Sequence, residues 1–203
     1  MEKKKKIGIM GGTFNPIHHG HLILAERAYH QFKLDRILIM PNKNTYYKKM
    51  PTNVTQEQRL KMLQLAIEDN DHFLLSMEEI NREGTTYTVE TLRNLTAQHP
   101  DYEYYFIMGA DSLYHIESWY QVEDIFRMAR IIVAGRGVGT LSALESQIEY
   151  IENKYDASIE LLQAPIMEIA SNDIRKRVKN KESIRYLLPQ KVIDYIYANH
   201  VYE

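Results

Sequence analysis

The chain contains no cysteine among its 203 residues, and this absence excludes disulfides, thiolate metal sites and cysteine nucleophiles. It also lacks an excess of either charge, because 25 Lys and Arg stand against 27 Asp and Glu for a net charge of -2. A global basic field that would attract nucleic acid or an anionic membrane is therefore missing. No apolar run approaches the roughly 18 residues of a membrane span. We expect neither nucleic acid nor a membrane as a partner.

The composition that is present is typical of a globular protein, with 44% hydrophobic and 26% charged residues. The length favours a single domain over residues 1–203, including a small helical part from about 171 to 203. Four lysines end at Lys6, but the apolar stretch after them breaks at Gly11, so we expect no signal peptide. The lack of cysteine agrees with a cytoplasmic location.

Short apolar runs alternate with longer amphipathic stretches, which favours βαβ units. This order predicts an α/β fold of the Rossmann-like, doubly wound kind, with a mostly parallel sheet and helices on both faces. Ligands in such sheets bind beyond the carboxyl ends of the strands. The expected strands are 6–10, 36–40, 73–76, 104–108, 130–134 and 159–162, and the expected helices are 17–32, 55–69, 88–98, 112–128, 141–155, 172–179 and 189–199.

The segment Gly11–His21, GGTFNPIHHGH, follows the first expected strand and is the strongest signal in the chain. Two adjacent glycines permit a tight turn and present amides without a Cβ, which suits phosphate binding. We expect Asn15 to be the N-cap and Pro16 the first residue of the next helix, whose positive end then faces the same place. Neither GxGxxG nor GxxxxGK[ST] follows the strand. The segment indicates an anion site of another kind.

Three histidines lie within four residues at the end of this segment. His18 and His21 are three residues apart, so they share a helix face and are both able to donate to a phosphate that gains charge in a transition state. Metal ligation is an alternative, but a catalytic zinc needs a third protein ligand that the sequence does not identify. Helix capping by the histidines is a second alternative.

Two separated motifs resemble those of the nucleotidyltransferase superfamily. Gly11–Phe14 with His18–His21 is similar to its GG[ST]F and HxGH signatures, and Ile169–Arg175, IASNDIR, is similar to its ISSTxIR motif. Along most of the chain the resemblance is to bacterial nicotinate-nucleotide adenylyltransferases. Supporting stretches are Thr86–Thr88, Met108–Asp111, Trp119–Tyr120 and Ser183–Pro189.

The resemblance implies transfer of the adenylyl group of ATP to nicotinate mononucleotide, with release of pyrophosphate, in NAD biosynthesis. A phosphate is already a nucleophile, which agrees with the lack of a convincing nucleophile and base pair in the sequence. The family would use His18 and His21 as catalytic residues, and Mg²⁺ would accompany ATP. The implied ATP-binding residues are Gly11, Gly12, Thr13, Phe14, His18, His21, Gly109, Asp111, Ser171, Asn172 and Arg175.

The resemblance also implies four residues for nicotinate mononucleotide. Trp119, the only tryptophan, would stack on the pyridine ring, and Thr88 and Tyr114 would offer backbone amides to its carboxylate. Lys48 would meet a phosphate. For several of these residues an ordinary helix cap or packing role is the alternative.

Two departures from the family pattern stand out. Thr45–Lys48 replaces a Pro-Pro-His-Lys run, so only the lysine matches, and Ala170 and Asn172 replace the usual Ser and Thr of the late motif. The competing functions are another adenylyl- or cytidylyltransferase, such as a phosphopantetheine adenylyltransferase, and a nucleotide-binding regulator without chemistry. The sequence leaves open whether the chain forms a homo-oligomer.

Overall fold

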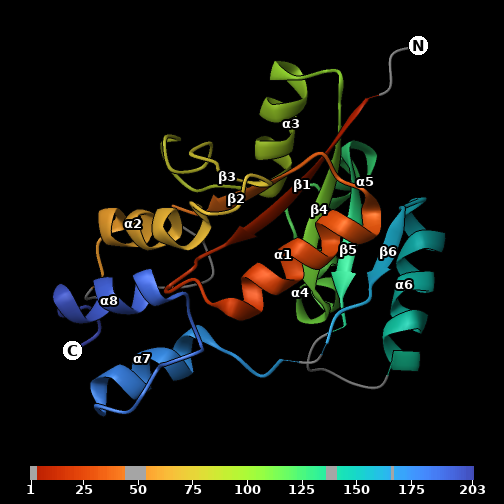
Figure 1. Ribbon diagram of the computed structural model, residues 1–203. Coiled ribbons are helices and arrows are strands. Elements are labelled where there is room, and N and C mark those ends of the chain that lie inside the picture. Colours follow the sequence, from red (N-terminus) through yellow and green to blue (C-terminus); the bar gives the residue numbers. More distant parts are fainter. Residues whose placement is uncertain (1–3, 44–53, 136–140, 166) are drawn as a thin grey trace.

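The computed structural model describes residues 4–43, 54–135, 141–165 and 167–203. Its centre is a six-stranded, parallel sheet with the strand order β3-β2-β1-β4-β5-β6 (Figure 1). This order confirms the doubly wound fold expected from the alternation of strands and helices. The strands are β1 (Lys5–Gly12), β2 (Arg36–Pro41), β3 (Phe73–Leu75), β4 (Tyr102–Gly109), β5 (Ala129–Ala134) and β6 (Ile159–Leu162).

Both faces of the sheet are buried, because an apolar cluster covers each of them. Alternate side chains of a strand point to opposite faces and so enter different clusters. In β4, Tyr105 and Ile107 belong to one apolar cluster, whereas Tyr104 and Phe106 belong to the other. The central strands therefore consist of nearly continuous apolar runs, as the sequence indicated.

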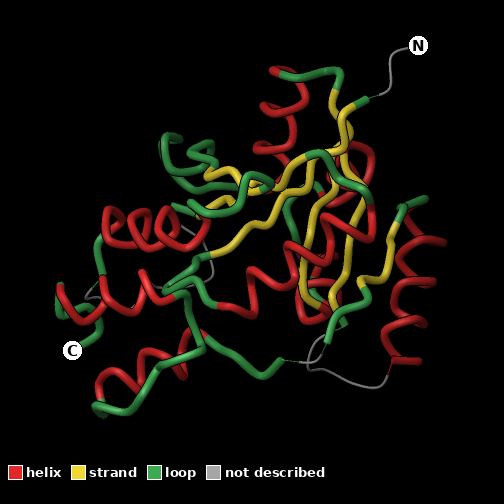
Figure 2. Tube along the Cα trace, viewed as in Figure 1, coloured by secondary structure: helices red, strands yellow, loops and turns green. Residues whose placement is uncertain are grey.

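Helices cover each face of the sheet, as the tube trace shows (Figure 2). The first cluster contains apolar side chains of α1 (His19–Phe32), α2 (Gln56–Ile67), α7 (Ser171–Lys179) and α8 (Gln190–Ala198). The second contains those of α3 (Thr88–Gln98), α4 (Ala110–Tyr114), the 3₁₀ helix η1 (Ile116–Ser118), α5 (Val122–Met128) and α6 (Leu141–Tyr155). Within the described part of the chain, no helix has the length and apolar character to cross a bilayer.

The single helix expected over 112–128 is wrong, because α4, η1 and α5 divide that stretch. Trp119 is extended, with φ -75° and ψ 142°, and Gln121 adopts left-handed φ 51°. No glycine or proline marks this break in the sequence. Tertiary packing causes it, since Ile116, Val122 and Ile125 are all buried in the second cluster.

Candidate active site

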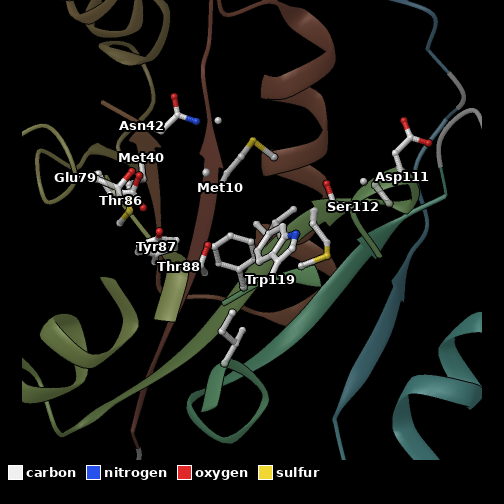
Figure 3. A pocket seen from close by; sticks show the side chains of 18 of the residues that line it. Met10, Met40, Asn42, Glu79, Thr86, Tyr87, Thr88, Asp111, Ser112 and Trp119 are labelled. Atoms are coloured by element: carbon white, nitrogen blue, oxygen red, sulfur yellow. The ribbon is translucent and has the colours of Figure 1, made fainter. Parts of the chain in front are cut away.

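A cavity of about 440 Å³ opens beyond the carboxyl ends of β1, β2 and β4. It lies where the strand order reverses between β1 and β4, which is the position expected for a ligand in this topology. Figure 3 shows Trp119 between the Thr86–Thr88 segment on one side and Asp111 and Ser112 on the other. Of the residues singled out from the sequence, Gly11, Gly12, His21, Thr88, Gly109, Asp111 and Trp119 line the cavity.

The backbone of the β1–α1 connection differs from the expected glycine turn. Gly11 and Gly12 are the last residues of β1 and still pair with β2. The left-handed residue is Phe14, with φ 45°. A Cβ at Gly12 would lie 3.1 Å from the Phe14 ring, so this glycine allows the ring to fold back under the strand end. Thr13 follows Gly12, and Phe14 is buried outside the cavity lining.

The expected N-cap at Asn15 is wrong, because α1 begins at His19 and its N-cap is His18. Both oxygens of Asn15 have other partners, whereas its side-chain nitrogen has none within the described residues. Its side-chain oxygen accepts a hydrogen bond from the Tyr202 hydroxyl at 2.7 Å, and its carbonyl accepts one from Arg175 at 2.7 Å. Asn15 therefore joins distant parts of the chain, and Pro16 precedes the helix without being its first residue.

The two histidines come together at the start of α1. Their rings stack with centroids 3.7 Å apart and an interplanar angle of 29°. The His18 amide donates to Nδ1 of His21 at 3.3 Å, so a neutral His21 carries its proton on Nε2. His21 lines the cavity, whereas His18 is buried behind it. The helix start thus presents one imidazole that a second imidazole supports.

The late motif lies directly against this segment, although 155 or more residues separate them in the sequence. The Ser171 hydroxyl donates to the carbonyl of Pro16 at 2.8 Å, and Arg175 binds both the Asn15 carbonyl and the side chain of Asn172. These three residues do not line the cavity itself. Ala170 is the N-cap of α7, so Ser171 is the first residue of the helix.

A polar network supports the Thr86–Thr88 side of the cavity. The carboxylate of Glu79, which lines the cavity, accepts hydrogen bonds from the hydroxyls of Thr91 and Thr86. Arg82 donates to Thr91 and to the Tyr87 carbonyl. Burial raises the pKa of the Glu79 carboxyl, and the hydroxyl hydrogen bonds and the Arg82 charge oppose this shift. The network orients the start of α3, whose first residue is Thr88.

An aromatic wall completes this side of the cavity. The Trp119 indole packs edge-on against Phe106, with ring centroids 5.9 Å apart at 90°. Its other surface is available to the cavity, because the break after η1 turns Trp119 out of the helix. Tyr120, which is half exposed, and Tyr87 form a second ring pair 4.9 Å apart.

On the opposite side, Gly109 ends β4 and is the N-cap of α4, so Asp111 stands in the first turn of that helix with an exposed carboxylate. Asp111 is therefore not the helix cap, and it lines the cavity instead.

Tyr114 packs against the second apolar cluster and does not line the cavity. Lys48 lies outside the described residues. The described residues contain no group of three or more His, Cys, Asp or Glu that would hold a metal ion.

Asn42 and Glu79 line the cavity but belong to none of the motifs in the sequence. Each follows a strand, β2 and β3 respectively, and that position was the only available signal. Asn42 also stands at the edge of a polar stretch without periodicity, where one residue is not distinguishable from the next.

Comparisons with known proteins agree with this architecture. A family model described as cytidylyltransferase-like matches residues 9–177. A curated protein of Lachnoclostridium phytofermentans, named probable nicotinate-nucleotide adenylyltransferase, is 46% identical over 198 residues, which cover 98% of this chain and 99% of that protein. A protein of the same name from Bacillus cytotoxicus is 39% identical, with 98% and 99% of the two chains covered.

Solved structures show the same fold at lower sequence identity. Nicotinic acid mononucleotide adenylyltransferase of Plasmodium falciparum complexed with NaAD is similar with a TM-score of 0.80 and 21% identity, and the match covers 98% of this chain and 97% of that one. The same enzyme complexed with APC gives a TM-score of 0.77.

Proposed function

Because the chain belongs to the nicotinate-nucleotide adenylyltransferase family, we propose that its cavity binds ATP and nicotinate mononucleotide side by side for adenylyl transfer. The observation that carries this assignment is the convergence of three features at the β1/β4 switch point. His21 and the Gly11–Gly12 strand end form one wall, Trp119 and Thr88 form another, and the late motif is bonded to the loop between β1 and α1.

The reaction joins two anions. A phosphate oxygen of nicotinate mononucleotide attacks the α-phosphorus of ATP, the bond from that phosphorus to the bridging oxygen breaks, and pyrophosphate leaves. The products are nicotinate adenine dinucleotide and pyrophosphate. No side chain needs to act as nucleophile, so the protein contributes orientation and charge stabilisation.

The start of α1 supplies the donors for the triphosphate in this proposal. His21 and the Gly11–Gly12 end of β1 line the cavity, and the positive end of α1 adds to them. His18 holds the His21 ring by stacking and through its amide. Thr13 and Phe14 shape the connection between these donors.

The start of α7 supplies a second set of donors. Ser171, Asn172 and Arg175 lie beside the same connection, and a helix N-terminus with an arginine one turn later suits phosphate oxygens. Their present bonds to Asn15 and Pro16 set the distance between the two phosphate-binding helix ends.

The remaining cavity walls suit the two organic groups. We place the pyridine ring on Trp119 and its carboxylate at the start of α3, where Thr88 supplies an amide. By the family resemblance, Tyr114 would offer a second amide to the carboxylate, and Lys48 would meet a phosphate. Asp111, beyond Gly109, is placed to accept hydrogen bonds from the ribose of ATP.

Mg²⁺ fits this site as a companion of ATP. The carboxylates in the described lining, Glu79 and Asp111, stand on opposite sides of the cavity (Figure 3). The phosphates of ATP would therefore be the main ligands of the ion, as is usual for magnesium. Bound there, it would neutralise part of the phosphate charge.

A panel of acceptor phosphates tests the function. Purified protein with ATP and Mg²⁺ is given nicotinate mononucleotide, nicotinamide mononucleotide or phosphopantetheine, and pyrophosphate release is followed. We expect the highest kcat/KM with nicotinate mononucleotide. Preference for phosphopantetheine would favour the rival transferase, and nucleotide binding without turnover on any acceptor would favour a regulator.

A further inference from the structure

Arg59 is the only charged residue among the buried polar side chains of the described chain, with 1% of its surface exposed. It lies in the first turns of α2, beneath the β1–α1 connection. One terminal nitrogen, Nη1, donates to the carbonyl of Thr13 at 2.8 Å, and the other, Nη2, donates to that of Asn42 at 3.0 Å. A single guanidinium therefore ties the chain after β1 to the chain after β2.

One carbonyl belongs to a residue that lines the cavity, and the other belongs to the neighbour of a lining residue. Asn42 lines the cavity, and Thr13 directly follows the lining residue Gly12. In this region β1 has ended and α1 has not begun, so the carbonyls of residues 13, 15 and 16 accept hydrogen bonds from side chains of α2 and α7. Since buried carbonyls need partners, these side chains determine where the connection lies.

The charge of Arg59 has no anionic partner within the described residues, because both of its acceptors are neutral carbonyls and it forms no ion pair there. The segment 44–53 contains no Asp or Glu. Tyr202 lies nearby, and burial raises its pKa, so it remains neutral. Desolvation lowers the pKa of Arg59, yet a guanidinium stays charged in proteins.

A buried cation without a counterion is costly unless something compensates it. The Nε of Arg59 has no hydrogen-bond partner either. The adjacent cavity is where a polyanion binds under the proposed function, so the substrate triphosphate is the natural source of negative charge.

We propose that Arg59 is a positioning residue of the adenylyl-transfer site. It holds the phosphate-binding connection at a set distance from Asn42, and the bound triphosphate balances its charge. The inference rests on the proposed function for the identity of the anion. The alternative is that Arg59 only stabilises the fold. Its substitution would then lower folding stability without changing ATP affinity or kcat.

Three variants separate these roles. Arg59→Met removes the charge and both hydrogen bonds, Arg59→Lys keeps the charge but is unable to hold both carbonyls in one fixed fork, and Arg36→Met is the control. Arg36 also donates to a backbone carbonyl, that of Asp71, but it is exposed and lies at the opposite end of β2. ATP dissociation constants come from calorimetry, and kcat and KM come from pyrophosphate release.

We expect Arg59→Met to weaken ATP binding and to lower kcat, each by about tenfold or more. Arg59→Lys should recover most of the ATP affinity while kcat stays low, and Arg36→Met should stay within about twofold of wild type. Wild-type ATP affinity and kcat in Arg59→Met, measured below its melting temperature, would overturn the proposal. If that variant does not fold, a wild-type kcat in Arg59→Lys overturns it.

The ATP measurement also distinguishes the two proposals. If wild-type protein binds ATP but does not use nicotinate mononucleotide, the proposed acceptor is wrong, and the loss of ATP affinity in Arg59→Met still decides the role of Arg59. If Arg59→Met binds ATP as wild type does while wild-type protein turns over normally, only the inference on Arg59 fails.

Discussion

At the scale of single residues, Gly20 determines how the two histidines stand. A Cβ added at this position would lie 2.9 Å from Nδ1 and 3.0 Å from Cε1 of the His18 ring. The glycine between the histidines is therefore required by the close approach of an imidazole to the helix backbone. Its φ is not in the left-handed region, so helix geometry alone would accept alanine.

Gly20→Ala should consequently separate catalysis from stability. Alanine favours the helix, but the His18 ring must move and carry His21 with it, and a misplacement of about 1 Å costs about 10²-fold in rate. We expect kcat to fall by about that factor, while the melting temperature stays the same or rises. Arg27→Ala, at an exposed position of α1, is the control for kcat. An unchanged kcat in Gly20→Ala would contradict the proposed placement of the histidines.

Trp119 is the residue whose substitution should affect one substrate only. Trp119→Leu keeps an apolar side chain but removes the flat ring, so the KM for nicotinate mononucleotide should rise about tenfold, whereas the KM for ATP should change little. Steady-state kinetics with each substrate varied in turn measures both. An equal rise in both values would indicate that the tryptophan only supports the cavity wall through Phe106.

At the scale of elements, α2 and α8 are joined on the surface by an ion pair between Glu68 and Lys191. The Lys191 hydrogen bond and charge lower the pKa of Glu68, and Glu68 in turn raises the pKa of Lys191. The stabilisation from Glu68 is present above the pKa of the unfolded chain and is lost as the pH falls through its lower folded value. The stabilisation from Lys191 is lost only as the pH rises through its raised pKa, which requires strong alkali.

Lys191→Met should therefore lower the urea midpoint slightly at pH 7, since exposed pairs contribute little. The difference from wild type should vanish in acid, once Glu68 is protonated. NMR titration of Glu68 should show its pKa returning toward the ordinary glutamate value in the variant, and Lys179→Met, at an exposed position of α7, should leave it unchanged. A Glu68 pKa that is the same in wild type and Lys191→Met would contradict the pairing.

At the scale of the whole molecule, the C-terminal part of the chain contacts the first loop. The Tyr202 hydroxyl and Arg175 both bind Asn15, and apolar side chains of α7 and α8 share a cluster with α1 and α2. We propose that the helical part from 171 to 203 belongs to the same folding unit as the sheet. The single domain over residues 1–203 stays a prediction.

Tyr202→Phe tests this long-range connection. The substitution deletes one oxygen and leaves the buried side chain of Asn15 without that donor, so the free energy of unfolding should fall by about 1 to 3 kcal/mol. Tyr197→Phe, on α8 with 44% of its surface exposed, should change it by less than about 0.5 kcal/mol. Urea unfolding of both variants provides the comparison. Equal stability of Tyr202→Phe and wild type would show that the hydroxyl does not hold the loop.

The sequence by itself determined the alternation of strands and helices outside 112–128, because apolar periodicity follows local backbone geometry. It also predicted an anion site after β1, since a glycine pair and clustered histidines are local features. The tertiary structure alone decided the N-cap at His18 and the break that turns Trp119 into the cavity. Tyr202 and Arg175, which bind Asn15, are far away from it in sequence, and the break depends on the second apolar cluster. Arg59 belongs to the same class, because nothing in the helical pattern of α2 distinguishes a buried arginine from a solvated one until the loops above it are in place.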